Sequence, residues 1–386
     1  MLTVAAAFAG FPAITYDVPA AAATPCIASG TEAAINAALV GPGARAILCP
    51  GATFLLYNPV TFTAPDQQLY TQDLPADSRR AILRLASAPV TTAVIAYRQS
   101  GVAVRNIQVD GNRSALGHAN GGALLEMGAA RDQAVEDTYV HDTRSWSSIH
   151  FIEGAVVNDT PECQNGRIAG NTVGPSGDDT FRMWADGISL ACGHSLVEDN
   201  TVIDATDGGI VIFGAPGSTV AHNTITARTR TLLGGINMVD HAPFHGNFSG
   251  TTVRDNVIDA QGAFIKVGIA MGQQVWSCDP GVVYGGTVRN NALKGAYFGY
   301  GYAVNGVRNW TVSGNEDEAR HVGIAGHGCR GLNAQPTGFQ YQSESASTLQ
   351  PQFRPATLTD VLNVSAPPDA VPDRHRVTAC THRSPS

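Results

Sequence analysis

Two aspartates occur in similar settings in the chain, each directly before a glycine: Asp186 in Ala185-Asp-Gly and Asp207 in Thr206-Asp-Gly. Two carboxyls that lie close together repel, so one keeps its proton while the other ionises. An acid beside a base is what the hydrolysis of a glycosidic bond requires. The alternative interpretation is that each aspartate caps a turn before its glycine. We predict both as catalytic residues, together with His150, which we expect to face outward beside Trp146.

Other polar and aromatic side chains are expected around this pair. The predicted substrate-binding residues are Asn237, Lys266, Arg182, Trp184, Ser189, Asp240 and His241. Tryptophan can stack on a sugar ring, although it more often serves packing. Asp178 and Asp179 are adjacent carboxylates in a loop, and such pairs suit calcium, although most are only solvated. We expect that no cofactor is required and that calcium is the one ion to test.

An internal repeat must position these residues. Its units read as a short strand, an asparagine at a bend and a second short strand, as in Val197-Glu-Asp-Asn-Thr-Val-Ile203. The asparagines lie at positions 171, 200, 223, 256, 291 and 315, at spacings typical of solenoid repeats. Asparagine tolerates the left-handed backbone of a tight bend. We therefore predict structural asparagines that stack, coil on coil, as a hydrogen-bonded ladder.

A third strand follows a longer loop in each unit. Alternation places one isoleucine per strand inward, at positions 149, 188, 210, 236 and 269. The same alternation predicts an outward column that consists of Ser148, Gly187, Gly209, Gly235, Gly268, Gly301 and Gly323, either as a floor for a sugar chain or as simple strand starts. Asp186 and Asp207 would then lie on neighbouring coils, with backbones about 4.8 Å apart.

These patterns predict an all-β chain that folds as a single-stranded right-handed parallel β-helix. No long amphipathic helices separate the strands, which argues against a globular α/β fold. The expected divisions are 1–25, a signal peptide or flexible N-terminus; 26–80, a capping helix and first coil; 81–338, the β-helix; and 339–386, an extended tail whose last part is disordered.

The capping-helix pattern, the Cys49-Pro-Gly-Ala-Thr53 opening and the Asn-Thr-Ile coil pattern resemble the pectin-lyase-like β-helix superfamily over roughly residues 30–340. That superfamily includes glycoside hydrolases, polysaccharide lyases, epimerases, esterases and phage tailspikes, so the resemblance implies a fold rather than one reaction. One of its families, the polygalacturonases, has motifs that match this chain at Asp186, Asp207 and Lys266. The paired aspartate, the histidine and the arginine of those motifs are missing here.

The cysteines and the net charge indicate the compartment and the kind of partner. The chain has seven cysteines, and pairing in chain order gives Cys26–Cys49, Cys163–Cys192 and Cys278–Cys329, with Cys380 left over. Disulfides of this kind and the apolar stretch Leu2–Ile14 favour a secreted protein. A net charge of −8 argues against nucleic acid, and no further stretch is long enough to cross a membrane. We expect a monomer whose partner is a polysaccharide.

Two other functions fit the same residues. A polysaccharide lyase would remove a proton beside a uronate carboxyl with Lys266, His150 or an arginine as the base. A non-catalytic glycan-binding solenoid would use the same groove without turnover. Long, uneven loops between the second and third strands favour a built site, because function collects on loops held by a rigid scaffold. Few outward basic residues line the third-strand sheet, which ranks the lyase lower, so a glycoside hydrolase is the leading hypothesis.

Overall fold

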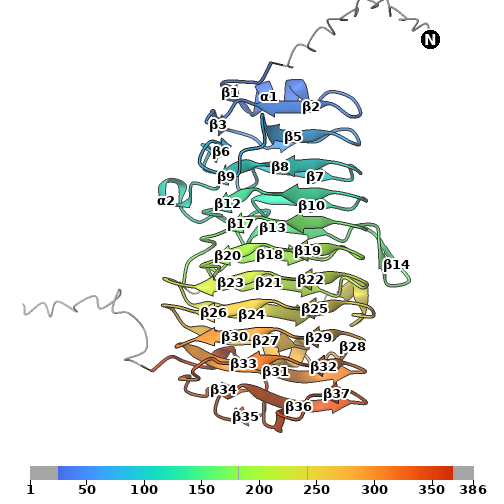
Figure 1. Cartoon of the computed structure of the whole chain (residues 1–386), viewed down its shortest axis with the longest axis vertical. Coiled ribbons are helices and arrows are strands. Elements are labelled where there is room, and N and C mark those ends of the chain that lie inside the picture. Colours follow the sequence, from blue (N-terminus) through green and yellow to red (C-terminus); the bar gives the residue numbers. More distant parts are fainter. Residues whose placement is uncertain (1–24, 181, 241, 368–386) are drawn as a thin grey trace, which may run out of the picture.

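The computed structural model describes residues 25–180, 182–240 and 242–367. The strands stack as successive coils along one long axis (Figure 1). Three long parallel sheets, here named A, B and C, run along the whole stack, and each coil contributes a strand to them. The expected signal peptide, the end of the tail and Cys380 lie outside the described residues.

Sheets A and B contain the short strands of the repeat. Sheet A consists of β2 (Arg45–Leu48), β5 (Gln68–Thr71), β8 (Ala103–Arg105), β11 (Ala134–Glu136), β16 (Arg167–Ala169), β19 (Leu196–Glu198), β22 (Thr219–Ala221), β25 (Thr252–Arg254), β29 (Thr287–Arg289), β32 (Thr311–Ser313) and β37 (Thr348–Leu349). Sheet B consists of β1 (Gly30–Thr31), β3 (Thr53–Leu56), β6 (Ala81–Leu85), β9 (Ile107–Asp110), β12 (Tyr139–His141), β17 (Thr172–Val173), β20 (Thr201–Ile203), β23 (Thr224–Ala227), β26 (Val257–Ala260), β30 (Ala292–Gly295) and β33 (Glu316–Asp317).

Sheet C is formed by the third strand of each coil. It consists of β4 (Val60–Thr61), β7 (Val94–Tyr97), β10 (Leu125–Gly128), β13 (Ser147–Ile152), β18 (Asp186–Leu190), β21 (Gly208–Phe213), β24 (Leu232–Val239), β27 (Ile265–Met271), β31 (Phe298–Arg308), β36 (Phe339–Ser345) and β38 (Arg354–Pro355), with β28 (Val283–Tyr284) beside β31. The remaining elements are hairpins β14 (Val156–Val157) with β15 (Thr160–Pro161) and β34 (His327–Gly328) with β35 (Gly331–Leu332), helices α1 (Glu32–Ala38), α2 (Arg113–Leu116) and α3 (Gln273–Trp276), and 3-10 turns η1 (Ala242–Phe244) and η2 (Val361–Asn363).

The core is a column of apolar side chains enclosed by the three sheets. The predicted inward isoleucines of sheet C are confirmed, because Ile149, Ile188, Ile210, Ile236 and Ile269 follow one another in register and all are 0 % exposed. Burying one such side chain contributes about 1.5–3 kcal/mol. Repetition of this contribution in every coil stabilises the stack.

The asparagine ladder is also confirmed. The side-chain Nδ2 of Asn200 donates to Oδ1 of Asn223, and Nδ2 of Asn223 donates to Oδ1 of Asn256, each over 2.9 Å. The chain of bonds begins at Asn171 and continues through Asn291 and Asn315 to Gln350. These side chains are almost fully buried. Each one therefore supplies the hydrogen bonds that the backbone groups at its bend cannot obtain from water.

The ends of the stack differ from its middle. Helix α1 follows Thr31, whose hydroxyl accepts the backbone N–H of Ala33, and it buries Ile35 in the core. At the other end, β36 and β37 extend sheets C and A, so the solenoid continues past the boundary expected at residue 338. Residues 356–367, here called the C-terminal segment, then pack on the outer face of sheet C, where Leu358 and Val361 are buried.

Three disulfides cross-link the chain. They join Cys26 to Cys49, Cys163 to Cys192 and Cys278 to Cys329, which confirms the expected pairing. Such bonds restrict the unfolded chain and stabilise the fold. Within the part of the chain that the structure describes, no helix has the length and apolar character needed to span a bilayer.

Candidate active site

The two aspartates lie together on the outer side of sheet C. Asp186 begins β18, and its Oδ1 accepts the backbone N–H of Gly208 on β21 over 2.8 Å. Asp207 precedes that glycine, and its own N–H donates to the carbonyl of Ala185 over 3.1 Å. Gly208 is therefore opposite Asp186, and Asp207 is one residue out of the expected register. The two carboxyls nevertheless interact, and the negative charge of Asp207 raises the pKa of Asp186.

Burial gives both carboxyls an affinity for protons that is unusual for aspartate. Asp186 is 5 % exposed, and burial together with the neighbouring charge of Asp207 raises its pKa well above 3.8. Burial raises the pKa of Asp207 to about 6. Two adjacent carboxyls do not ionise independently, so the second proton is held more tightly than the first. Burial and the mutual repulsion of the two carboxyls therefore keep a proton on the pair to a higher pH than an exposed aspartate would hold it.

A line of hydroxyls supports Asp186. The hydroxyl of Ser189 lies 2.7 Å from Asp186 Oδ2 and 2.8 Å from the hydroxyl of Ser147, which in turn lies 3.2 Å from the carbonyl oxygen of Ile149. Both serines are 0 % exposed. Because a hydroxyl can donate or accept, this line can bind a protonated or an ionised carboxyl. It therefore allows Asp186 to exchange a proton without leaving a buried group unpaired.

Two glycines lie against the side chains of Asp186 and Asn237 on the outer side of sheet C. A side chain at Gly208 would come to 3.1 Å from Asp186 Oδ1 and 2.9 Å from Nδ2 of Asn237 on β24. A side chain at Gly234 would collide with Oδ1 of Asn237 and with the ring of Trp276. Asn237 is 0 % exposed, and neither its amide nitrogen nor its carbonyl oxygen has a hydrogen-bond partner among the described residues.

The predicted glycine column is wrong as a floor. A side chain at Gly187, Gly209, Gly235 or Gly268 would meet the core side chains Val202, Ile225, Ile258 and Leu293 respectively. These glycines thus face inward, because a local irregularity at the start of each strand shifts the alternation by one residue. The outward positions belong instead to the preceding residues, which include Asp186, Gly208 and Gly234.

Three pockets form a row beside the aspartate pair. The first, about 330 Å³, is lined by Trp146, His150, Ile152, Glu153, Ala191 and Phe213. The second, about 180 Å³, shares Trp146 and is lined also by His118, Asn120, Gly121, Ser145, Arg182 and Trp184. The third, about 330 Å³, shares His118 and contains Arg113, Ser114, Gly117, Asp142, Gly177, Asp178, Met183 and Arg230. Neither aspartate of the pair lines these pockets.

Trp146 connects the pockets with the pair. Its carbonyl accepts the backbone N–H of Asp186 over 2.8 Å, and its ring meets that of His150 edge-on with centroids 4.7 Å apart. His150 lies in register with Ser189, one coil away. Trp146 is 37 % exposed, so part of its side chain is accessible to a ligand. His150 lines the first pocket and Arg182 and Trp184 line the second, both of which share Trp146; their role as site residues stays a prediction.

The other predicted residues that the structure describes are engaged by different partners. Lys266 donates to the carbonyl of Leu362 over 2.6 Å, beneath the C-terminal segment, and burial lowers its pKa. Asp240 follows β24 and accepts the N–H of Gly246 over 2.8 Å. Asp178 accepts from Thr180, while Asp179 accepts from Thr231, so the adjacent carboxylates bind different partners. His241 lies outside the described residues.

Glu126 is a partly buried carboxyl on sheet C that the sequence analysis did not single out. It lies on β10 in register with His150, and burial raises its pKa. The signal was the strand Leu125-Glu-Met-Gly128, whose alternation matches that of the following coil. Glu126 thus adds an outward carboxyl to the same face as the aspartate pair.

Two groups of three ligand-type side chains lie close together within residues 25–180, 182–240 and 242–367. One contains Cys278, Cys329 and Asp360, but its cysteines form a disulfide and offer no thiolate. The other contains Asp110, His141 and Asp142, where Arg84 pairs with Asp110 over 2.7 Å. Neither includes Asp178 or Asp179, and calcium binding there stays a prediction.

Comparison with solved structures identifies the fold. The A-module of a mannuronan C-5 epimerase from Azotobacter vinelandii matches with a TM-score of 0.54 and 14% identity, over 89% of this chain and 98% of that one. A hyperthermoactive exopolygalacturonase from Thermotoga maritima matches with a TM-score of 0.53 and 15% identity, over 77% and 84%. No protein family model matches the chain, and no match occurs among curated proteins. The chain is a parallel β-helix protein, and at this identity the likeness shows the fold alone.

Proposed function

We propose that this protein is a carbohydrate-active enzyme, a glycoside hydrolase that cleaves a polysaccharide with Asp186 as general acid and Asp207 as general base. The observation that carries the proposal is the carboxyl pair of unequal burial over the glycine at position 208. Pairs whose environments separate their proton affinities supply an acid and a base at one pH. The two matched structures bear names that refer to mannuronan and polygalacturonate, which agrees with a polysaccharide partner.

In the proposed reaction, Asp186 gives its proton to the glycosidic oxygen as the bond from that oxygen to the anomeric carbon breaks. Asp207, ionised, takes a proton from the water whose oxygen bonds to the same carbon. Both products are then neutral at the cleaved bond, and Asp186 is left ionised while Asp207 is protonated. The serine line from Ser189 to Ser147 supports Asp186 in both states.

A polysaccharide lyase is the weaker alternative. A lyase needs a base for the proton beside the uronate carboxyl, and Lys266 was one candidate for that role. The amine of Lys266 is instead bonded to Leu362 under the C-terminal segment. His150, which lines the pocket beside Trp146, is the other candidate base for such chemistry.

We further propose that the protein works outside the cytosol. The three disulfides agree with an oxidising compartment, where such bonds persist. A monomeric state, a requirement for no cofactor and binding of calcium at Asp178 and Asp179 all stay predictions.

The test is hydrolysis of a panel of plant, algal and fungal polysaccharides, followed by reducing-end release. The wild-type chain should release reducing ends from at least one polymer. Asp186→Asn and Asp207→Asn should each lower the rate by a factor of about 10² or more, the usual contribution of a positioned acid or base. Asp199→Asn, an exposed aspartate on a neighbouring turn, is the control and should retain full activity. Activity retained in both pair variants would reject the assignment.

A further inference from the structure

The outer face of sheet C changes along the axis of the stack. One row of outward residues runs from coil to coil in register: Ile95, Glu126, His150, Ser189, Val211, Asn237, Ala270 and Ala303. Its first three members are partly exposed, whereas its last three are 0 % exposed. The middle two, Ser189 and Val211, are 0 % and 5 % exposed, so the row is partly open on the coils before Asp186 and buried from the coil of Asp186 onward.

Two elements form the cover. Helix α3 packs on β24, β27, β31 and η2. The C-terminal segment adds Leu358, Val361 and Val364, which pack on Val267, Ala270, Tyr300 and Ala303 as a second apolar cluster outside the β-helix. Burial of this cluster holds the cover against the sheet, because apolar area is removed from water on both sides.

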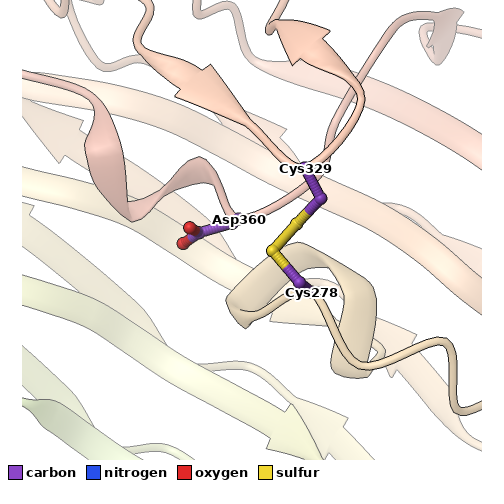
Figure 2. Close-up of side chains that lie close together, drawn as sticks. All are labelled: Cys278, Cys329 and Asp360. Carbon is purple, nitrogen blue, oxygen red and sulfur yellow. A yellow bond between two sulfur atoms is a disulfide. The ribbon is translucent and has the colours of Figure 1, made fainter.

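Several bonds tie the cover to the stack. The N–H of Asp360 donates to the carbonyl of Gln274 in α3 over 3.1 Å, and Asn305 donates to the carbonyl of Leu358 over 2.6 Å. Figure 2 shows the disulfide that joins Cys278, just after α3, to Cys329, with Asp360 beside it. Cys329 lies between β34 and β35, next to Arg330, whose N–H donates to Thr359. These bonds hold the cover, which we also call the wall, in place on the outer face of sheet C.

Asn237 lies at the foot of this wall. The ring of Trp276, the last residue of α3, is 2.8 Å from the position of a side chain on Gly234, which Asn237 also overlies. The amide of Asn237 is fully buried and makes no hydrogen bond with the described residues. An unpaired buried amide is unfavourable for folding, so its retention calls for a partner that binds there. A sugar hydroxyl donates and accepts, and two of them would satisfy both ends of the amide.

We infer that α3, the C-terminal segment and Asn237 close one end of the binding groove, so that the groove takes a free terminus of a carbohydrate chain. Asn237 binds hydroxyls of the terminal sugar, and the rest of the chain extends past Asp186 toward Trp146 and the N-terminal coils. The cleavage site next to the terminus rests on the proposed function, whereas the closed subsite itself requires only binding.

The experiment compares free and capped oligosaccharides. The probes are hexamers of galacturonate, mannuronate and each polymer that wild type hydrolyses, unmodified, capped at the reducing end, capped at the non-reducing end, or capped at both. Binding is measured by titration calorimetry with Asp186→Asn, which prevents turnover. We expect at least one unmodified hexamer to bind, one of its single caps to weaken binding at least tenfold, and the double cap to do the same. Equal binding of the unmodified and doubly capped forms would overturn the closed end, as would the absence of any binding.

Asn237→Ala in the same background tests the residue. It should weaken binding of the unmodified hexamer about 3- to 10-fold, the effect of one or two neutral hydrogen bonds, without lowering the unfolding temperature. The control is Asn256→Ala, an equally buried asparagine whose amide is fully bonded in the ladder; it should lower the unfolding temperature and leave binding unchanged. Unchanged binding in Asn237→Ala, or a loss of stability equal to that of the control, would reject the role of Asn237.

The results also separate this inference from the proposed function. Cleavage of doubly capped hexamers that requires Asp186 and Asp207 would leave the hydrolase in place and remove the closed end. Binding that depends on a free terminus, without hydrolysis by wild type, would leave the closed subsite in place and remove the hydrolase.

Discussion

Replacing Asp207 with asparagine should make the protein more stable at pH 7 but not at pH 4. The folded protein raises the pKa of Asp207 to about 6 from 3.8, so the native state holds this proton more tightly than the unfolded chain does. Stability from this group is therefore fully present below pH 3.8 and is lost as the pH rises through 6. One pKa unit corresponds to about 1.4 kcal/mol, so the full shift is worth about 3 kcal/mol at pH 7.

Solvent reduces that figure. Asp207 is partly exposed, and screening by water weakens the effect, so we expect Asp207→Asn to raise the free energy of unfolding by about 1–2 kcal/mol at pH 7. At pH 4 the wild-type carboxyl is largely protonated when folded, and the difference should be under about 1 kcal/mol.

Urea unfolding of both proteins at the two pH values measures the effect, since the difference between variants cancels the other titrating groups. Asp199→Asn replaces an exposed aspartate and should show the same difference at both pH values. A variant Asp207→Asn that is no more stable than wild type at pH 7, or that gains equally at pH 4, would refute the electrostatic account of the pair.

Two further predictions concern the ladder and the groove. Asn223→Ala should lower the free energy of unfolding by about 2–4 kcal/mol, because it leaves the backbone N–H of Asn200 and Oδ1 of Asn256 without this partner; urea unfolding measures it, and a loss below 1 kcal/mol would contradict the structural role. Trp146→Ala should weaken oligosaccharide binding about tenfold, because an exposed indole can stack on a sugar ring. Since the side chain is 37 % exposed, the free energy of unfolding should change by about 1 kcal/mol or less. Titration calorimetry and urea unfolding measure the two effects, and unchanged binding would exclude Trp146 as a stacking platform.

The repeating part of the fold could be predicted from the sequence. Asn200, Asn223 and Asn256 recur in one sequence pattern, and a parallel stack places equivalent residues directly above one another. The hydrogen-bonded asparagine ladder could therefore be predicted. The inward isoleucines followed for the same reason. Disulfide pairing in chain order succeeded because each bonded pair lies on neighbouring coils or on the adjoining cover.

The details of the site could not be predicted, because they depend on departures from the repeat. A one-residue irregularity at the start of the sheet C strands turns Gly187 and Gly209 inward and the preceding Asp186 and Gly208 outward, and alternation alone cannot detect it. The engagement of Lys266 by Leu362 depends on a contact between residues 96 positions apart. Whether a polar residue such as Asn237 has a partner depends likewise on what packs above it.

The chemistry proposed here depends on a sugar bond lying at the aspartate pair. The most direct measurement is a crystal structure of Asp186→Asn with a bound oligosaccharide from a hydrolysed polymer. We predict a glycosidic oxygen within about 2.6–3.2 Å of the side chain at position 186, with a water or the anomeric carbon facing Asp207. A sugar chain bound on another face, with no glycosidic oxygen near residue 186, would contradict the account.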